Sequence, residues 1–71
     1  MKYYIDLGEN GGAKVYTHVT KPEGVAHLTR VGATPVEALR RLMLEEYHRD
    51  IVVRSSDQER FGVWYIDYSV K

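Results

Sequence analysis

Three histidines and one short polar segment are the residues of this chain whose types could support chemistry. His18, His27 and His48 could bind a metal ion, but the first two are expected on different strands and the third at a helix end. None has a Cys, His or carboxylate neighbour at metal-ligand spacing. Residues 55–57, Ser-Ser-Asp, could supply a nucleophile, yet no general base or oxyanion donor accompanies them. We therefore predict no metal site, no catalytic residue and no cofactor.

Two other features that could support an enzyme, a phosphate-binding loop and an acid–base pair, have little support in the sequence. Gly8, Gly11 and Gly12 do not form a phosphate-binding loop, because a strand rather than a helix is expected to follow them. An acid–base pair of His18 with Asp6 is the remaining catalytic alternative, and it ranks below the binding functions considered next. The chain is therefore not predicted to be an enzyme.

Composition limits the kind of protein. The 71 residues suffice for one domain, 1–71. A domain of this size buries only about 60% of its unfolded surface, so a homodimer would add burial that the monomer lacks. Ten basic residues balance ten acidic ones, so no long-range field attracts a polyanion. There is no cysteine, and neither an apolar leader nor a membrane span is evident, so we expect cytoplasmic residence without membrane contact.

The first twenty residues predict an antiparallel hairpin. Lys2 to Leu7 and Ala13 to Val19 both alternate apolar and polar side chains. A two-residue turn would mix the two faces, whereas a loop of residues 9–11, with Gly11 in the left-handed region, keeps them separate. This register predicts three cross-strand pairs: Tyr4 with Tyr16, Ile5 with Val15, and Asp6 with Lys14.

The segment from Gly32 to Leu39 holds the signals that start a helix. Thr34 can cap the first turn, Pro35 suits the first helical position, and Glu37 can complete a capping box. The helix is expected to run from Pro35 to about His48, where a cation in the last turn would complement the helix dipole. Its predicted apolar face consists of Val36, Ala38, Leu39, Leu42, Met43 and Tyr47.

The remaining segments predict strands and turns. Val25 to Arg30 predicts a third strand with Leu28 facing inward. After the helix we expect a short buried strand at Ile51–Arg54, a polar connection at Ser55–Arg60, and a long strand at Phe61–Val70. The expected class is α+β: an antiparallel sheet of four to five strands in the order βββαββ, with one amphipathic helix on one face.

The sheet face opposite the helix is the predicted binding surface. If Tyr3, Ile5, Leu7, Val15 and Val19 face the core, tyrosine and lysine side chains occupy the other face. The last strand adds either Val63 and Tyr65 or Trp64 and Tyr68 to that face. Six tyrosines suit a contact surface, although they could equally serve as cross-strand pairs that stabilise the sheet. The predicted partner-binding residues are Lys2, Tyr4, Lys14, Tyr16, His18 and Tyr65.

Residues 1 to about 48 carry a pattern found in one known family. Met1-Lys2-Tyr3, Gly11-Gly12, and the set Gly32, Thr34, Glu37 and Ala38 stand in the order in which that family places them. On these residues the chain resembles the N-terminal domain of HicB-type antitoxins. The resemblance implies a small sheet packed by a helix that binds and blocks a ribonuclease toxin. Residues 51–70 predict a strand pair where the family usually has a DNA-binding domain, so operator binding is not expected.

Two binding functions follow from the sequence. The favoured one is a non-catalytic protein-binding module, an inhibitor or antitoxin-like blocker of a nuclease or nuclease complex, acting through the aromatic face or through its last strand as a sheet edge. An alternative, by analogy of size, is an accessory inhibitor of a phage or mobile element, such as an anti-CRISPR. The second is a single-stranded nucleic-acid binder that stacks bases on its tyrosines, which the zero net charge disfavours.

Overall fold

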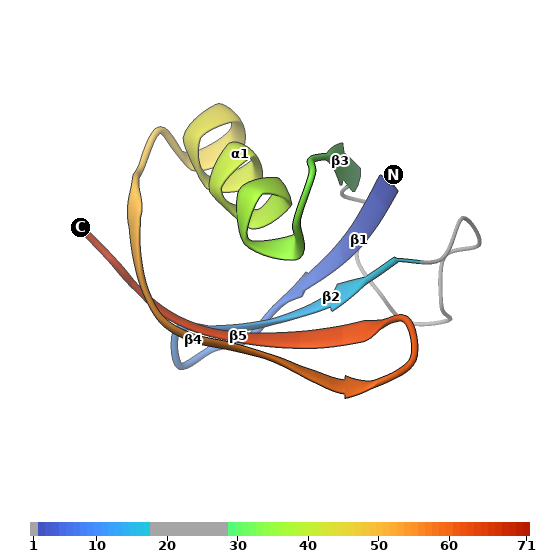
Figure 1. Ribbon diagram of the computed structural model, residues 1–71. Coiled ribbons are helices and arrows are strands. Elements are labelled where there is room, and N and C mark those ends of the chain that lie inside the picture. Colours follow the sequence, from blue (N-terminus) through green and yellow to red (C-terminus); the bar gives the residue numbers. More distant parts are fainter. Residues whose placement is uncertain (1, 18–28) are drawn as a thin grey trace.

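The computed structural model describes residues 2–17 and 29–71 of the chain, and within them one helix covers one face of an antiparallel sheet (Figure 1). The sheet order is β3-β1-β2-β5-β4. The elements are β1 (Lys2–Leu7), β2 (Gly12–Tyr16), β3 (Thr29–Val31), α1 (Pro35–Tyr47), β4 (Ile51–Arg60) and β5 (Val63–Val70). The predicted α+β class and the order βββαββ are confirmed. We call the face that packs against α1 the inner face and the opposite one the outer face.

The hairpin of β1 and β2 has the predicted register. Ile5 lies opposite Val15, Tyr4 opposite Tyr16 and Asp6 opposite Lys14. Gly11 has φ of 77°, a left-handed conformation that glycine adopts without steric cost, as the three-residue loop requires. The predicted end of the second strand, from His18 to Val19, lies outside the described residues.

Apolar side chains from both layers form one core between α1 and the inner face. Val15, Leu39, Leu42 and Ile66 are fully buried there. The helix buries Ala38, Leu39, Leu42 and Met43, which confirms most of its predicted apolar face. Tyr47 is the exception: it was predicted on that face but is 48% exposed. It is the last residue of the helix.

The start of α1 follows the predicted capping chemistry with one difference. The Thr34 hydroxyl accepts a hydrogen bond from the Glu37 backbone N–H at 3.2 Å, as an N-cap does. In a standard capping box the Glu37 carboxylate would accept from the backbone N–H of the cap residue itself. Here it accepts instead from the N–H of Ala33, one residue earlier, at 3.1 Å. The carboxylate therefore also fixes the chain that enters the helix.

The end of α1 differs from the sequence-based expectation. His48 lies just after the helix with φ of 54° and ψ of 37°, the left-handed conformation that glycine usually supplies at this place. Its backbone N–H bonds to the Leu44 carbonyl, and the Arg49 N–H bonds to the Met43 carbonyl. His48 thus closes the helix with its backbone, and the prediction of a histidine in the last turn was wrong.

β3 is short and is linked to the helix by charge. Residues Thr29–Val31 pair with β1, while Val25 to Leu28 of the predicted third strand, with Leu28 inward, lie outside the described residues. Arg30 lies opposite the buried Tyr3 and forms ion pairs with both Glu45 and Glu46 of α1. These ion pairs connect one edge of the sheet directly to the helix layer.

Two predictions about the C-terminal half were wrong. Ser55–Arg60 is not a loop, because β4 continues through these residues to Arg60, with register shifts between Val53 and Ser55 and between Gln58 and Arg60. Polar and charged residues are accommodated there because β4 is an edge strand that contacts water. The last strand is not an edge either: β5 pairs with both β2 and β4 and lies inside the sheet.

Candidate functional site

The outer face is built from two rows of cross-strand neighbours. Residues that lie directly opposite each other in an antiparallel sheet point to the same side, so the strand pairings define these rows. One row contains Tyr4, Tyr16, Val63 and Arg60, and the next contains Asp6, Lys14, Tyr65 and Asp57. Both rows cross β1, β2, β5 and β4. No described element covers this face, which Figure 1 shows on the side of the sheet away from α1.

The pairings resolve which side chains of the last strand reach the outer face. Trp64 lies opposite Val15, whose side chain is fully buried, and it packs against the core. Tyr65 lies opposite the exposed Lys14 and is 38% exposed. Of the two alternatives left open by the sequence, Val63 and Tyr65 on the outer face is therefore the correct one. Val63 itself is only 4% exposed, so Tyr65 is the accessible member of that pair.

Tyr65 is held flat along the outer face by a glycine. A β-carbon at Gly12 would overlap the Tyr65 hydroxyl group and come within 2.8 Å of ring atom Cζ. A side chain at position 12 would therefore require the Tyr65 ring to shift. Beside it lies a recess of about 240 Å³, whose lining includes Asp6, Lys14 and Tyr65. An aromatic ring, an ammonium group and a carboxylate thus lie together over β1, β2 and β5.

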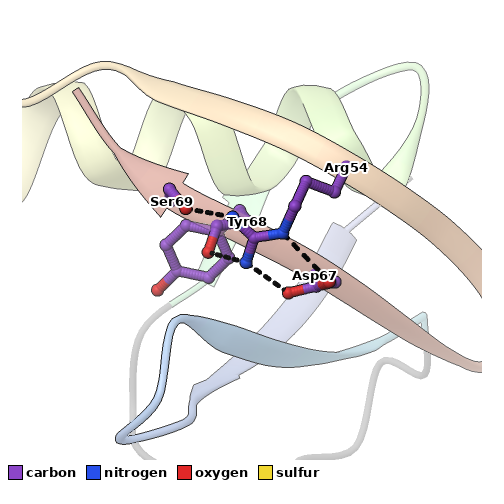
Figure 2. Close-up of polar contacts among 4 residues, drawn as sticks. All are labelled: Arg54, Asp67, Tyr68 and Ser69. Carbon is purple, nitrogen blue, oxygen red and sulfur yellow. Dashed lines mark hydrogen bonds and ion pairs between the residues drawn. The ribbon is translucent and has the colours of Figure 1, made fainter.

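An ion-pair network fixes the β4 side of the outer face. Arg54, at a register shift of β4, donates to both carboxylate oxygens of Asp67 on β5, at 3.1 and 2.6 Å. The same guanidinium donates to the Ser69 hydroxyl and to the Tyr68 carbonyl (Figure 2). The hydrogen bonds from Arg54 hold the pKa of Asp67 below its usual value, and Asp67 raises the pKa of Arg54. Both groups are charged at neutral pH, and the pair joins the two strands where their register changes.

Other charges on this face are also balanced. The Lys14 ammonium lies 3.9 Å from the Glu59 carboxylate, and both side chains are about half exposed. Asp6 and Asp57 lie in the same row as Lys14, and Arg60 lies in the neighbouring row. The outer face therefore presents both signs of charge around its tyrosines rather than a basic stripe.

The structure brings four of the six predicted partner-binding residues together. Tyr4, Lys14, Tyr16 and Tyr65 lie in adjacent positions of the two rows, with Tyr4 and Tyr16 half-buried. His18 and the side chain of Lys2 lie outside the described part of the chain. Arg54 and Asp67 belong to the same face but were not predicted, because the sequence placed Arg54 in a short buried strand and gave no reason to join it to Asp67.

The inner face carries a second surface that the sequence did not predict, an apolar groove of about 590 Å³. It lies between the first turn of α1 and the end of the β4–β5 hairpin, and its lining includes Tyr3, Val36, Phe61 and Trp64. The signal that could have indicated it is the Phe61-Gly62 turn, which puts a large aromatic residue at a hairpin tip. Phe61 is 89% exposed.

The described residues that were considered for catalysis or metal binding lie on β4 and at the end of α1. Ser55 and Asp57 belong to strand β4, and His48 is exposed at the helix end. Within residues 2–17 and 29–71, no three His, Cys, Asp or Glu side chains gather as metal ligands would. In the same part of the chain, no helix has the length and apolar character needed to cross a membrane. The arrangement on the outer face is suited to contact, through rings and paired charges.

Comparison with known proteins adds no relative: no family model, no curated protein and no solved structure matches this chain.

Proposed function

We propose that this protein is a non-catalytic binding module that contacts another protein through the outer face of its sheet. One observation carries the proposal: Tyr4, Tyr16 and Tyr65 lie in adjacent rows over three neighbouring strands, on a face that no described element covers. Tyrosine rings provide large, stiff contact areas and a hydroxyl that bonds at the rim, which is why they are frequent in protein interfaces.

The charges of this face support a protein partner over a nucleic acid. Lys14 has Glu59 as its neighbour, and Arg54 donates two hydrogen bonds to the Asp67 carboxylate. A surface that binds phosphates needs basic groups in excess, because affinity for the backbone comes from displacing its counterions. Mixed, mutually paired charges instead suit the polar rim of a protein interface.

The proposed partner is a nuclease or a nuclease complex. The support is the resemblance of residues 1 to about 48 to the N-terminal domain of HicB-type antitoxins, which block a ribonuclease by protein contact. An accessory inhibitor encoded by a phage or mobile element, such as an anti-CRISPR, has the same chemistry of contact and is included in the proposal. If the partner instead binds along an edge strand of the sheet, that strand is β4, because β5 lies inside the sheet.

The test compares capture by matched variants. Four immobilised proteins are incubated with nuclease-treated extract of the native host. They are the wild type, a double variant carrying Tyr4→Ser and Tyr16→Ser, the single variant Tyr65→Ser, and the control Tyr47→Ser. Tyr47 is similarly exposed, at 48%, but lies on α1 away from the outer face. We expect one protein to be retained by wild type and control and lost with the outer-face variants. Retention by all four would contradict the outer face as the contact surface.

Salt dependence separates the two classes of partner. A protein contact over paired charges should lose little affinity between about 50 and 200 mM salt, whereas several phosphate contacts would lose on the order of a thousandfold. The captured protein is then assayed for nuclease activity with and without the chain. Loss of its activity on addition of wild type, but not of the Tyr65→Ser variant, is the expected result.

A further inference from the structure

The apolar groove on the inner face differs from the rest of the surface in its chemistry. Its walls are Tyr3 from β1, Val36 from α1 and Trp64 from β5, and its polar members are neutral, including Ser56 and Gln58. None of the described residues that line it carries a charge, although 28% of the chain is charged. A recess of this size and character falls in the range of binding sites that take apolar groups.

The rim of the same groove carries a projecting apolar group. Phe61 lies in the turn between β4 and β5, and with 89% exposure it is the most exposed large apolar side chain of the described residues. Such exposure of a benzyl ring to water is costly, because burial of a phenylalanine is strongly favourable. The hairpin thus places an apolar projection directly beside an apolar recess.

A projection and a recess on one surface make that surface complementary to itself. In a twofold dimer the same patch of each copy meets the other, so residue i contacts residue j and residue j contacts residue i. We propose that this chain forms a twofold dimer in which Phe61 of each copy inserts into the groove of the other, against Val36 and Trp64.

Two further observations favour a second copy as the occupant. Because the described lining residues of the groove are uncharged, these parts of two identical surfaces can meet without like-charge repulsion. A chain of 71 residues also gains from an interface, since a monomer of this size buries a smaller share of its surface than a larger domain does. The groove opens on the inner face, so the dimer leaves both outer faces exposed and is independent of the proposed function.

Trp64 gives a direct readout, because it is the single tryptophan of the chain and lines the groove. Sedimentation velocity and tryptophan emission are measured on the full chain from about 1 to 500 µM, a range that spans weak to moderate dimer affinities. We expect the sedimentation coefficient to rise from monomer to dimer. Over the same range the Trp64 emission should shift to shorter wavelength, because Phe61 of the second copy excludes water from the indole.

Two variants test the projection and the recess separately. Phe61→Ser removes the projection from both copies and should raise the dimer dissociation constant on the order of 100-fold. Ala33→Phe fills the recess from within, since Ala33 is an exposed lining residue, and should also abolish the concentration-dependent emission shift. Tyr47→Ser is the control, an exposed aromatic residue outside the groove lining, and should dimerise like wild type.

Each outcome decides the proposal. A wild type that stays monomeric with constant Trp64 emission would overturn it. So would a dimer that Phe61→Ser and Ala33→Phe leave unchanged, because another surface would then make the contact. If Phe61→Ser loses its cooperative thermal transition, Ala33→Phe alone decides. Loss of partner capture by the outer-face variants in a protein that still dimerises would separate this proposal from the proposed function.

Discussion

The Tyr65 ring lies over Gly12, on the face of the sheet opposite the helix, so closely that a β-carbon at position 12 would require the ring to shift. This relationship joins β2 to β5 by packing as well as by hydrogen bonds. The effect of a substitution at position 12 should therefore depend on the residue at position 65.

Gly12→Ala should destabilise the protein, contrary to the general rule for strands. Alanine restricts the unfolded chain more than glycine does and is normally favoured within a strand by about 0.5–1 kcal/mol. Here its methyl group would displace the outer end of the Tyr65 ring, which is 38% exposed and can shift, so we expect a net cost below about 1 kcal/mol. The measurement is urea unfolding of Gly12→Ala, Tyr65→Ser and the double variant. The penalty should vanish in the Tyr65→Ser background, and a penalty of equal size in both backgrounds would exclude this cause.

Tyr4→Ser together with Tyr16→Ser should leave the fold intact. The two tyrosines face each other on the outer face and are half-buried, and a cross-strand pair contributes about 0.2–1 kcal/mol. Ile66→Ala, which empties a fully buried position, should cost about 2–5 kcal/mol. Thermal unfolding monitored by circular dichroism compares the two. A larger loss in the tyrosine double variant would mean that these residues belong to the core.

The protein should lose stability in acid as the Asp67 carboxylate becomes protonated. Its pKa is lower in the folded state because Arg54 donates hydrogen bonds to the carboxylate. The stabilising contribution is therefore complete well above the unfolded value of about 3.9 and is lost as pH falls through the folded pKa. Measured between about pH 6 and 2, the Tm of wild type should fall more steeply than the Tm of Asp67→Asn. Parallel curves would show that the ion pair contributes nothing to stability.

Thr34 should stabilise α1 through its hydroxyl. Thr34→Ala removes the acceptor of the Glu37 N–H and should cost about 1 kcal/mol in the free energy of unfolding. Thr34→Ser retains the hydroxyl and should stay within about 0.5 kcal/mol of wild type. Urea unfolding is the measurement, and equal losses in the two variants would mean that the methyl group of Thr34 matters more than its hydroxyl.

His48→Gly should raise stability. His48 has a left-handed backbone at the helix end, a conformation that costs a side-chain-bearing residue about 1 kcal/mol or more and glycine very little. Part of this gain is offset by the greater freedom of glycine in the unfolded chain, so we expect an increase of up to about 1 kcal/mol. His48→Ala keeps the strain and serves as the control. If both variants have the same Tm, the conformation carries no measurable cost.

Local signals explain what the sequence could predict. The alternation around Ile5 and Val15 allowed only one register that kept apolar residues on one side, and the structure has that register. The helix start was readable because Thr34, Pro35 and Glu37 each act within one turn. These features depend on residues only a few positions apart in the chain.

Features that depend on distant segments could not be predicted in this way. The 63–70 segment has large residues on both of its faces, so only pairing with β2 decides that Tyr65 faces outward. Ser55–Arg60 has the composition of a loop and becomes a strand because β5 supplies its hydrogen-bond partners. The groove needs Tyr3, Val36 and Trp64 from three separate elements, and no local pattern brings them together.

The position of β5 in the sheet also has a consequence for how the chain folds. β5 is the last strand in sequence, yet it lies between β2 and β4 and supplies the fully buried Ile66. Until residues 63–70 have been synthesised, the β1–β2 hairpin and the helix with β4 have no strand to connect them. A sheet closed by pairing of distant segments implies high contact order and slow folding, and it leaves a nascent chain with an open sheet edge during synthesis.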